Sequence, residues 1–76
     1  MNMLKRITFD SQVMGGKPCI RGLRVTVGTI IGLLAAGKTP KEILKAYSYL
    51  EEEDIHEALV YAAWRVEEIE QPLRVA

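Results

Sequence analysis

The sequence predicts a small, mostly α-helical domain: a compact bundle of three helices of the helix-turn-helix type that follows a short N-terminal β arm. From Val27 onward, apolar residues recur every three or four positions, which is the period of an α-helix. Before Val27 they alternate loosely with polar residues among glycines and a proline, which is typical of short strands and turns. With only 76 residues, the chain has room for one modest core. We therefore expect one domain over 1–76, with the arm at about 7–27 and the helices at about 27–70.

The arm begins with a short strand at 7–9, where apolar and polar residues alternate before the turn formers Asp10 and Ser11. The paired glycines Gly15 and Gly16 permit positive φ, and Pro18 lacks a backbone donor, so this stretch is expected to be a loop. Residues 19–27 alternate weakly and predict an extended arm or a second edge strand.

The first helix is expected from Val27 to Gly37, because a glycine can close a helix in the left-handed conformation. The second helix is expected from Thr39 to about residue 47. Thr39 is a good N-cap, Pro40 suits the first helical position, and Glu42 is placed to return a hydrogen bond to the cap.

The third helix is predicted to be the longest. Its acidic first turn at 51–54 suits the positive end of the helix dipole. The apolar stripe that follows consists of Ile55, Leu59, Ala62, Val66 and Ile69, and the helix is expected to end before Pro72.

A homodimer or a higher homo-oligomer is expected from the composition. The chain is 49% hydrophobic, which is high for so small an interior, and its lone Cys19 excludes an internal disulfide. The short first strand also needs a neighbouring strand, and the chain offers few. The expected dimer contacts therefore lie in the arm, at Ile7, Phe9, Val25 and Val27.

Membrane insertion is not expected. The longest apolar run, at 25–36, is interrupted by threonines and glycines and is too short to cross about 30 Å of hydrocarbon. Residues 1–10 lack the apolar stretch of a signal peptide, so we expect a cytoplasmic protein.

Charge divides the chain into two halves. Residues 1–45 hold eight Lys or Arg against two acids, and residues 46–76 hold two against eight. The halves could complement each other within or between protomers, or the basic half could face a partner or a nucleic acid. The candidates for DNA contact are Lys5, Arg6, Arg21, Arg24, Lys38, Lys41 and Lys45. Base reading by the third helix is not expected, because the carboxylates in its first turn would be repelled by phosphates.

Enzyme activity is not expected. The single histidine, His56, lies beside an acid on a predicted helix and is most simply a surface residue, and Cys19 has no evident base. The loop at 15–18 lacks the spacing of a phosphate-binding P-loop. We therefore expect no catalytic residues, no cofactor and no metal. Tyr61 and Trp64, three residues apart, fit either a core or an interface anchor.

Several motifs together resemble the small bacterial and archaeal family called domain of unknown function 433. The family-motif loop consists of Gly15, Gly16, Lys17, Pro18, Arg21, Gly22 and Arg24, and it follows Asp10. Matching helical segments lie at 37–43, at Tyr47, at 53–55 and at 58–62, so that the similarity covers roughly residues 7 to 65. Leu23 departs from the usual threonine, and Glu51 departs from a usual threonine or serine cap.

The resemblance implies a homeodomain-like three-helix fold with an N-terminal β arm. For members with an assigned role, it implies the antitoxin half of a type II toxin-antitoxin pair, whose usual partner is a PIN-like ribonuclease. The expected partner contacts are then Tyr61, Trp64 and Glu67 on the third helix. The basic half could also bind operator DNA for autoregulation. A stand-alone DNA-binding regulator and a dimeric scaffold remain the alternative functions.

Overall fold

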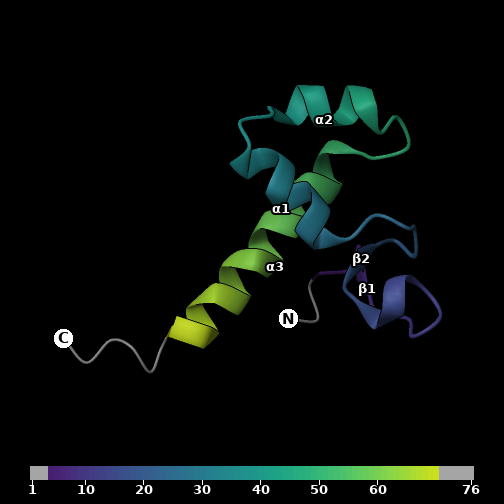
Figure 1. The fold of residues 1–76 in the computed structure, drawn as a ribbon, viewed down its shortest axis with the longest axis vertical. Coiled ribbons are helices and arrows are strands. Elements are labelled where there is room, and N and C mark those ends of the chain that lie inside the picture. The colour runs from purple at the N-terminus through teal and green to yellow at the C-terminus, as the bar shows by residue number, and fades with distance from the viewer. Residues whose placement is uncertain (1–3, 71–76) are drawn as a thin grey trace.

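The computed structural model describes residues 4–70, with side chains described for 4–67. The described chain is mostly helical. It contains α1 (Val27–Ala35), α2 (Pro40–Ala46) and α3 (Glu52–Glu70), preceded by strands β1 (Ile7–Thr8) and β2 (Cys19–Ile20) with a short 3₁₀ turn at Met14–Gly16 between them. Figure 1 shows α1 crossing α3, α2 lying near the start of α3, and the arm packed on one side. The end of the third helix before Pro72 lies outside the described residues.

The helix boundaries follow the local signals in the sequence. Gly37 has a φ of +96°, and the N–H groups of Gly37 and Lys38 donate to the carbonyls of Leu34 and Leu33 after α1, which is a Schellman ending. Thr39 accepts a hydrogen bond from the Glu42 N–H, and the Glu42 carboxylate accepts one from the Thr39 N–H. The capping box expected at α2 is therefore confirmed.

The arm differs from expectation at one point. β1 pairs with β2 of its own chain in an antiparallel register that sets Ile7 opposite Ile20 and Thr8 opposite Cys19. The premise that the first strand needs a strand from another copy is therefore wrong. Sequence periodicity missed this pairing because each strand has only two residues.

The core lies where the arm, α1, α2 and the first half of α3 meet. Its largest fully buried apolar residues are Ile20, Ile30 and Ile43, and Ile55 is 2% exposed. Three of the four expected dimer contacts belong to this core, since Ile7, Val25 and Val27 are buried. We correct that assignment: these three side chains stabilise the monomer, and only Phe9 among the four is exposed.

α3 extends beyond the elements that cover it. Its 19 residues span about 28 Å, whereas the nine residues of α1 span about 13 Å. The C-terminal half of α3 consequently projects from the body of the domain (Figure 1). Within the described residues, no helix combines the length and the apolar character needed to cross a membrane.

Candidate functional site

A buried carboxylate joins the arm to α3. Asp54 is fully buried and lies in the first turn of that helix. Arg21 binds it side-on: Nε donates to Oδ1 at 3.1 Å and Nη2 donates to Oδ2 at 2.9 Å. Arg6 Nη1 donates to Oδ1 at 2.9 Å, and the Glu51 N–H donates to Oδ2 at 2.8 Å. Both oxygens are thus fully used, and we call Arg6, Arg21, Glu51 and Asp54 the arm lock.

The arm lock sets the charge state of its members. Burial alone raises the pKa of Asp54, but hydrogen bonds from Arg21, Arg6 and the Glu51 N–H outweigh it and lower the pKa to about 2. The pKa of Arg6 is raised mainly by its hydrogen bond to Glu51 and next by its hydrogen bond to Asp54. In the first of these bonds, Arg6 Nη1 donates to Glu51 Oε1 at 2.6 Å. The carboxylate and both guanidiniums therefore stay ionised at neutral pH.

The family-motif loop is largely explained by the fold. Arg21 and Gly22 have φ values of +46° and +73°, and the Leu23 N–H donates to the Ile20 carbonyl across them. This is the pattern of a tight turn that needs positive φ at both central residues. Arg21 tolerates the left-handed conformation while Asp54 and the Tyr49 carbonyl hold its guanidinium. The expected positive φ of Gly15 and Gly16 is confirmed, at +67° and +85°.

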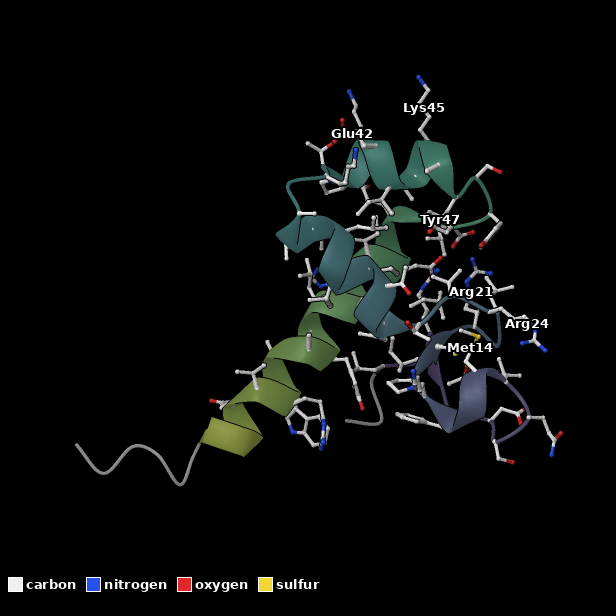
Figure 2. All side chains as sticks on the ribbon, in the orientation of Figure 1. Met14, Arg21, Arg24, Glu42, Lys45 and Tyr47 are labelled. Atoms are coloured by element: carbon white, nitrogen blue, oxygen red, sulfur yellow. The ribbon has the colours of Figure 1, made fainter. Side chains whose placement is uncertain are left out.

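Two of the seven residues expected to contact DNA belong to the arm lock. Arg6 and Arg21 are ion-paired with acids of the acidic half. The other five are exposed and make no ion pair within residues 4–67: Lys5, Arg24, Lys38, Lys41 and Lys45. Figure 2 shows Arg24 pointing away from the arm and Lys45 pointing away from α2. Lys17, the other cation of the family-motif loop, is exposed as well.

An aromatic groove lies between the arm and the projecting half of α3. It has a volume of about 330 Å³ and is lined by Leu4, Ile7, Phe9, Tyr61, Trp64 and Arg65. The ring centroids of Phe9 and Tyr61 lie 6.0 Å apart, as do those of Tyr61 and Trp64. The Arg65 guanidinium carbon lies 5.8 Å from the Trp64 ring centroid, within cation–π range.

The groove is open to a partner. Phe9 keeps 60% of its surface exposed even though it contacts Tyr61. Tyr61 and Trp64 are half-buried, so each ring packs on the domain and leaves part of its surface exposed. Glu67, the third expected partner contact, is exposed one turn beyond Trp64. Sequence reasoning did not place Phe9 beside them, because the contact joins residues that are 52 positions apart.

The residues considered for catalysis are dispersed. Cys19 is 2% exposed, and its thiol donates to the Lys17 carbonyl at 3.3 Å. His56 is exposed on α3. In the described part of the chain, no three His, Cys, Asp or Glu side chains gather closely enough to hold a metal ion.

Comparison with known proteins gives a consistent match along most of the chain. A family model described as a protein of unknown function, DUF433, matches residues 7–62. Protein y4eO of Sinorhizobium fredii, whose name says only that it is uncharacterised, is 36% identical over 56 residues; these are 74% of this chain but 25% of the relative. The chain thus spans about a quarter of that relative's length.

A solved structure agrees with the fold. The crystal structure of a DUF433 member protein from Anabaena variabilis superimposes with a TM-score of 0.77 at 32% sequence identity. The match covers 93% of this chain and 71% of the other. In the family match, Phe9 and Tyr61 fall inside the matched span, whereas Trp64 and Arg65 follow it.

Proposed function

The chain belongs to the DUF433 family, and we propose that it is an antitoxin-like regulatory protein, without enzyme activity, that binds and neutralises a PIN-like ribonuclease. The observation that carries the proposal is the open aromatic groove formed by Phe9, Tyr61 and Trp64. Aromatic side chains that are held in place and still exposed are the residues that anchor protein interfaces. The resemblance to antitoxins in sequence supplies the class of partner.

Charge supports a protein partner over DNA for the exposed side of α3. Glu52, Glu53 and Glu67 are exposed there. The first turn of α3 also holds Asp54 with its ion pairs to Arg6 and Arg21, so this end of the helix presents the arm lock rather than free hydrogen-bond donors for phosphate groups. A ribonuclease must bind polyanionic RNA, so its substrate site is basic. An acidic helix is complementary to such a site, which would speed association and also block RNA. In this proposal the aromatic groove anchors the complex and the acids of α3 face the nuclease.

The arm lock has a positioning role in this proposal. Arg6 belongs to the arm and immediately precedes β1, and Phe9 directly follows that strand. Through Arg6 and Arg21, Asp54 holds the arm against α3, so the arm side of the groove stays at a fixed place relative to Tyr61. A preformed groove costs less conformational entropy on binding than a loose arm would.

The test is to recover the partner and challenge the groove. The full chain, tagged and expressed at a low level in its host, is purified, and stoichiometric partners are identified by mass spectrometry. We expect a PIN-like ribonuclease whose RNA cleavage the purified chain inhibits. Phe9→Ala and Trp64→Ala should each weaken inhibition by about 10-fold or more, the loss expected when an interface anchor worth at least 1.4 kcal/mol is truncated.

The matched control is Tyr49→Ala, because Tyr49 is 52% exposed but lies outside the groove. It should inhibit like the native chain. Trp64 is the only tryptophan, so its fluorescence should shift when a partner fills the groove. A nuclease that both groove variants inhibit normally, or a chain that is recovered without any nuclease, would contradict the proposal.

A second function is favoured by the lysines around α2. Lys38, Lys41 and Lys45 are exposed within eight residues, and helical spacing puts Lys41 and Lys45 on one face. They suit phosphate contact by a regulator with the homeodomain-like helix-turn-helix fold that the resemblance implies. A DNA affinity that falls steeply between about 50 and 200 mM salt, and that Lys41→Glu with Lys45→Glu abolishes, would support this function. No binding at low salt would exclude it.

A further inference from the structure

The two aromatic residues that α3 contributes to the groove stand between two glutamates on one face of the helix. Four residues at intervals of four, three and four share this face: Glu57, Tyr61, Trp64 and Glu68. At about 100° per residue, their directions around the helix differ by at most about 60°. Of Glu68 only the place on the helix is described, because its side chain lies outside residues 4–67. The face of α3 that forms the groove therefore has an acid at either end of its two rings.

Glu57 borders the aromatic groove and has no cation of its own. It is half-buried, and its Oε1 accepts the N–H of Arg6 at 2.9 Å, next to the groove residue Ile7. Among residues 4–67, no lysine or arginine side chain forms an ion pair with this carboxylate. Asp54, three residues earlier, is by contrast held by two guanidiniums. The carboxylate of Glu57 thus leaves a negative potential beside the groove, which favours a cation there.

The aromatic rings of the groove can receive a cation on their faces. The planes of Phe9 and Tyr61 meet at 60° and those of Tyr61 and Trp64 at 49°, so the rings do not cover one another's faces by stacking. Ring faces are electron-rich and attract guanidinium and ammonium groups. Trp64 already holds such a group, the Arg65 guanidinium at 5.8 Å from its centroid. In the described part of the chain, no cation lies over the rings of Phe9 or Tyr61.

An anionic or a purely apolar occupant fits these observations less well. Arg65 is the one charged residue in the groove lining, but its guanidinium is stacked on Trp64. Along α3 as a whole, seven acids stand against this single arginine, so the field of the helix favours a cation over an anion. An apolar occupant would cover part of Glu57 without pairing its charge, which costs free energy.

We propose that the aromatic groove receives an arginine side chain of the partner protein, whose guanidinium stacks on Phe9 and Tyr61 and pairs with Glu57. Arginine suits this site better than lysine, because its planar guanidinium stacks on aromatic rings and donates two parallel hydrogen bonds to a carboxylate. This proposal rests on the proposed function for the identity of the partner, since a nuclease with a basic RNA site offers such side chains.

The test uses the full chain and small probes, so it needs no nuclease. N-acetyl-arginine amide is added to about 50 mM at constant ionic strength, and the indole N–H signal of Trp64, the only tryptophan, is followed by NMR. N-acetyl-citrulline amide is the matched probe, because it has nearly the same shape but no charge. N-acetyl-glutamate amide reports on an anionic occupant. We expect the arginine probe to saturate with a Kd on the order of 10 mM, and the other two to bind at least about 3-fold more weakly.

Three variants of the chain then test the parts of the site. Glu57→Gln keeps an acceptor for the Arg6 N–H but loses the charge, and it should bind the arginine probe about 3-fold more weakly or worse. Phe9→Leu keeps an apolar side chain but loses a ring face, and it should weaken binding similarly. Glu52→Gln is the matched control and should bind normally, because Glu52 is an exposed acid of α3 that lies about 150° around the helix from the aromatic pair. Far-UV circular dichroism checks that each variant keeps its helices.

Failure of the arginine occupant and failure of the nuclease function give different results. Selective binding of the arginine probe by a chain that recovers no nuclease supports this occupant and contradicts only the proposed function. No binding of the arginine probe at about 50 mM, equal binding of the three probes, or normal binding by Glu57→Gln overturns the occupant, whether or not a nuclease is recovered. Arg65→Gln removes the competing guanidinium and should bind the arginine probe at least as tightly as the native chain; weaker binding would indicate an anionic occupant and overturn the proposal.

Discussion

Replacing Asp54 with asparagine is expected to remove a large share of the folding free energy. Asparagine keeps the shape of the side chain, but it is neutral and leaves Arg6 and Arg21 without their shared anion. Removing one partner of a buried ion pair costs about 3–5 kcal/mol. The side chains of Arg6 and Arg21 keep 29% and 36% of their surface exposed, so water compensates for part of the loss and we expect about 2–4 kcal/mol.

The pKa of Asp54 gives a similar magnitude. Its value of about 2, against an ordinary 3.8, corresponds to about 2 kcal/mol of preference for the ionised carboxylate in the folded chain. A domain of 76 residues has a total stability of roughly 4–11 kcal/mol. The substitution is therefore expected to bring the domain close to the limit of stable folding.

The assay is urea unfolding at pH 7, followed by far-UV circular dichroism at one fixed protein concentration. With a slope of about 1 kcal/mol per molar urea, the midpoint should fall by roughly 2 M or more. Glu53→Gln is the control, because Glu53 is the neighbouring acid, is exposed and lies outside the arm lock. If Asp54→Asn unfolds within about 0.5 kcal/mol of the native chain or of Glu53→Gln, the reasoning is refuted. The hydrogen bonds of the arm lock would then only balance the cost of burying the carboxylate.

Three further predictions test the arm lock and the local signals. Because folding lowers the pKa of Asp54 to about 2, the ionised carboxylate should contribute fully to the free energy of unfolding above about pH 5, and this contribution should be lost as the pH falls from about 4 to 2. The urea midpoint of the native chain should therefore fall over this pH range, and the midpoint of Asp54→Asn should change less. Thr39→Ala should cost about 1 kcal/mol in thermal or urea unfolding because it removes the capping box of α2, whereas Thr39→Ser should retain most of it. Gly22→Ala should destabilise the fold by about 1 kcal/mol, because the φ of Gly22 is +73°. Gly32→Ala should stabilise the fold by up to about 1 kcal/mol, because Gly32 lies inside α1 with open space where a Cβ would be. If both substitutions changed the unfolding free energy in the same direction, the strain argument would be contradicted.

The sequence by itself determined the three helices and the ends of α1 and α2. The period of apolar residues from Val27 onward, the left-handed Gly37 and the box between Thr39 and Glu42 all involve residues within five positions of one another. Such signals act through backbone and side-chain contacts that the chain makes locally, whatever its tertiary fold. The positive φ of Gly15 and Gly16 was likewise predictable from residue type.

Only the tertiary structure decided what the charged and aromatic residues do. Asp54 looked like one acid among several in a helix first turn, yet it is the buried anion that receives Arg6 from 48 positions away and Arg21 from 33. The contact between Phe9 and Tyr61 and the pairing of β1 with β2 likewise join residues that are not neighbours in the sequence. Residues distant in sequence become neighbours only after the chain has folded, and no local pattern records which cation meets which acid. The exposure of Leu59 and Val66 has the same origin, because a stripe that looks uniform in sequence is covered only as far as the shorter helices reach.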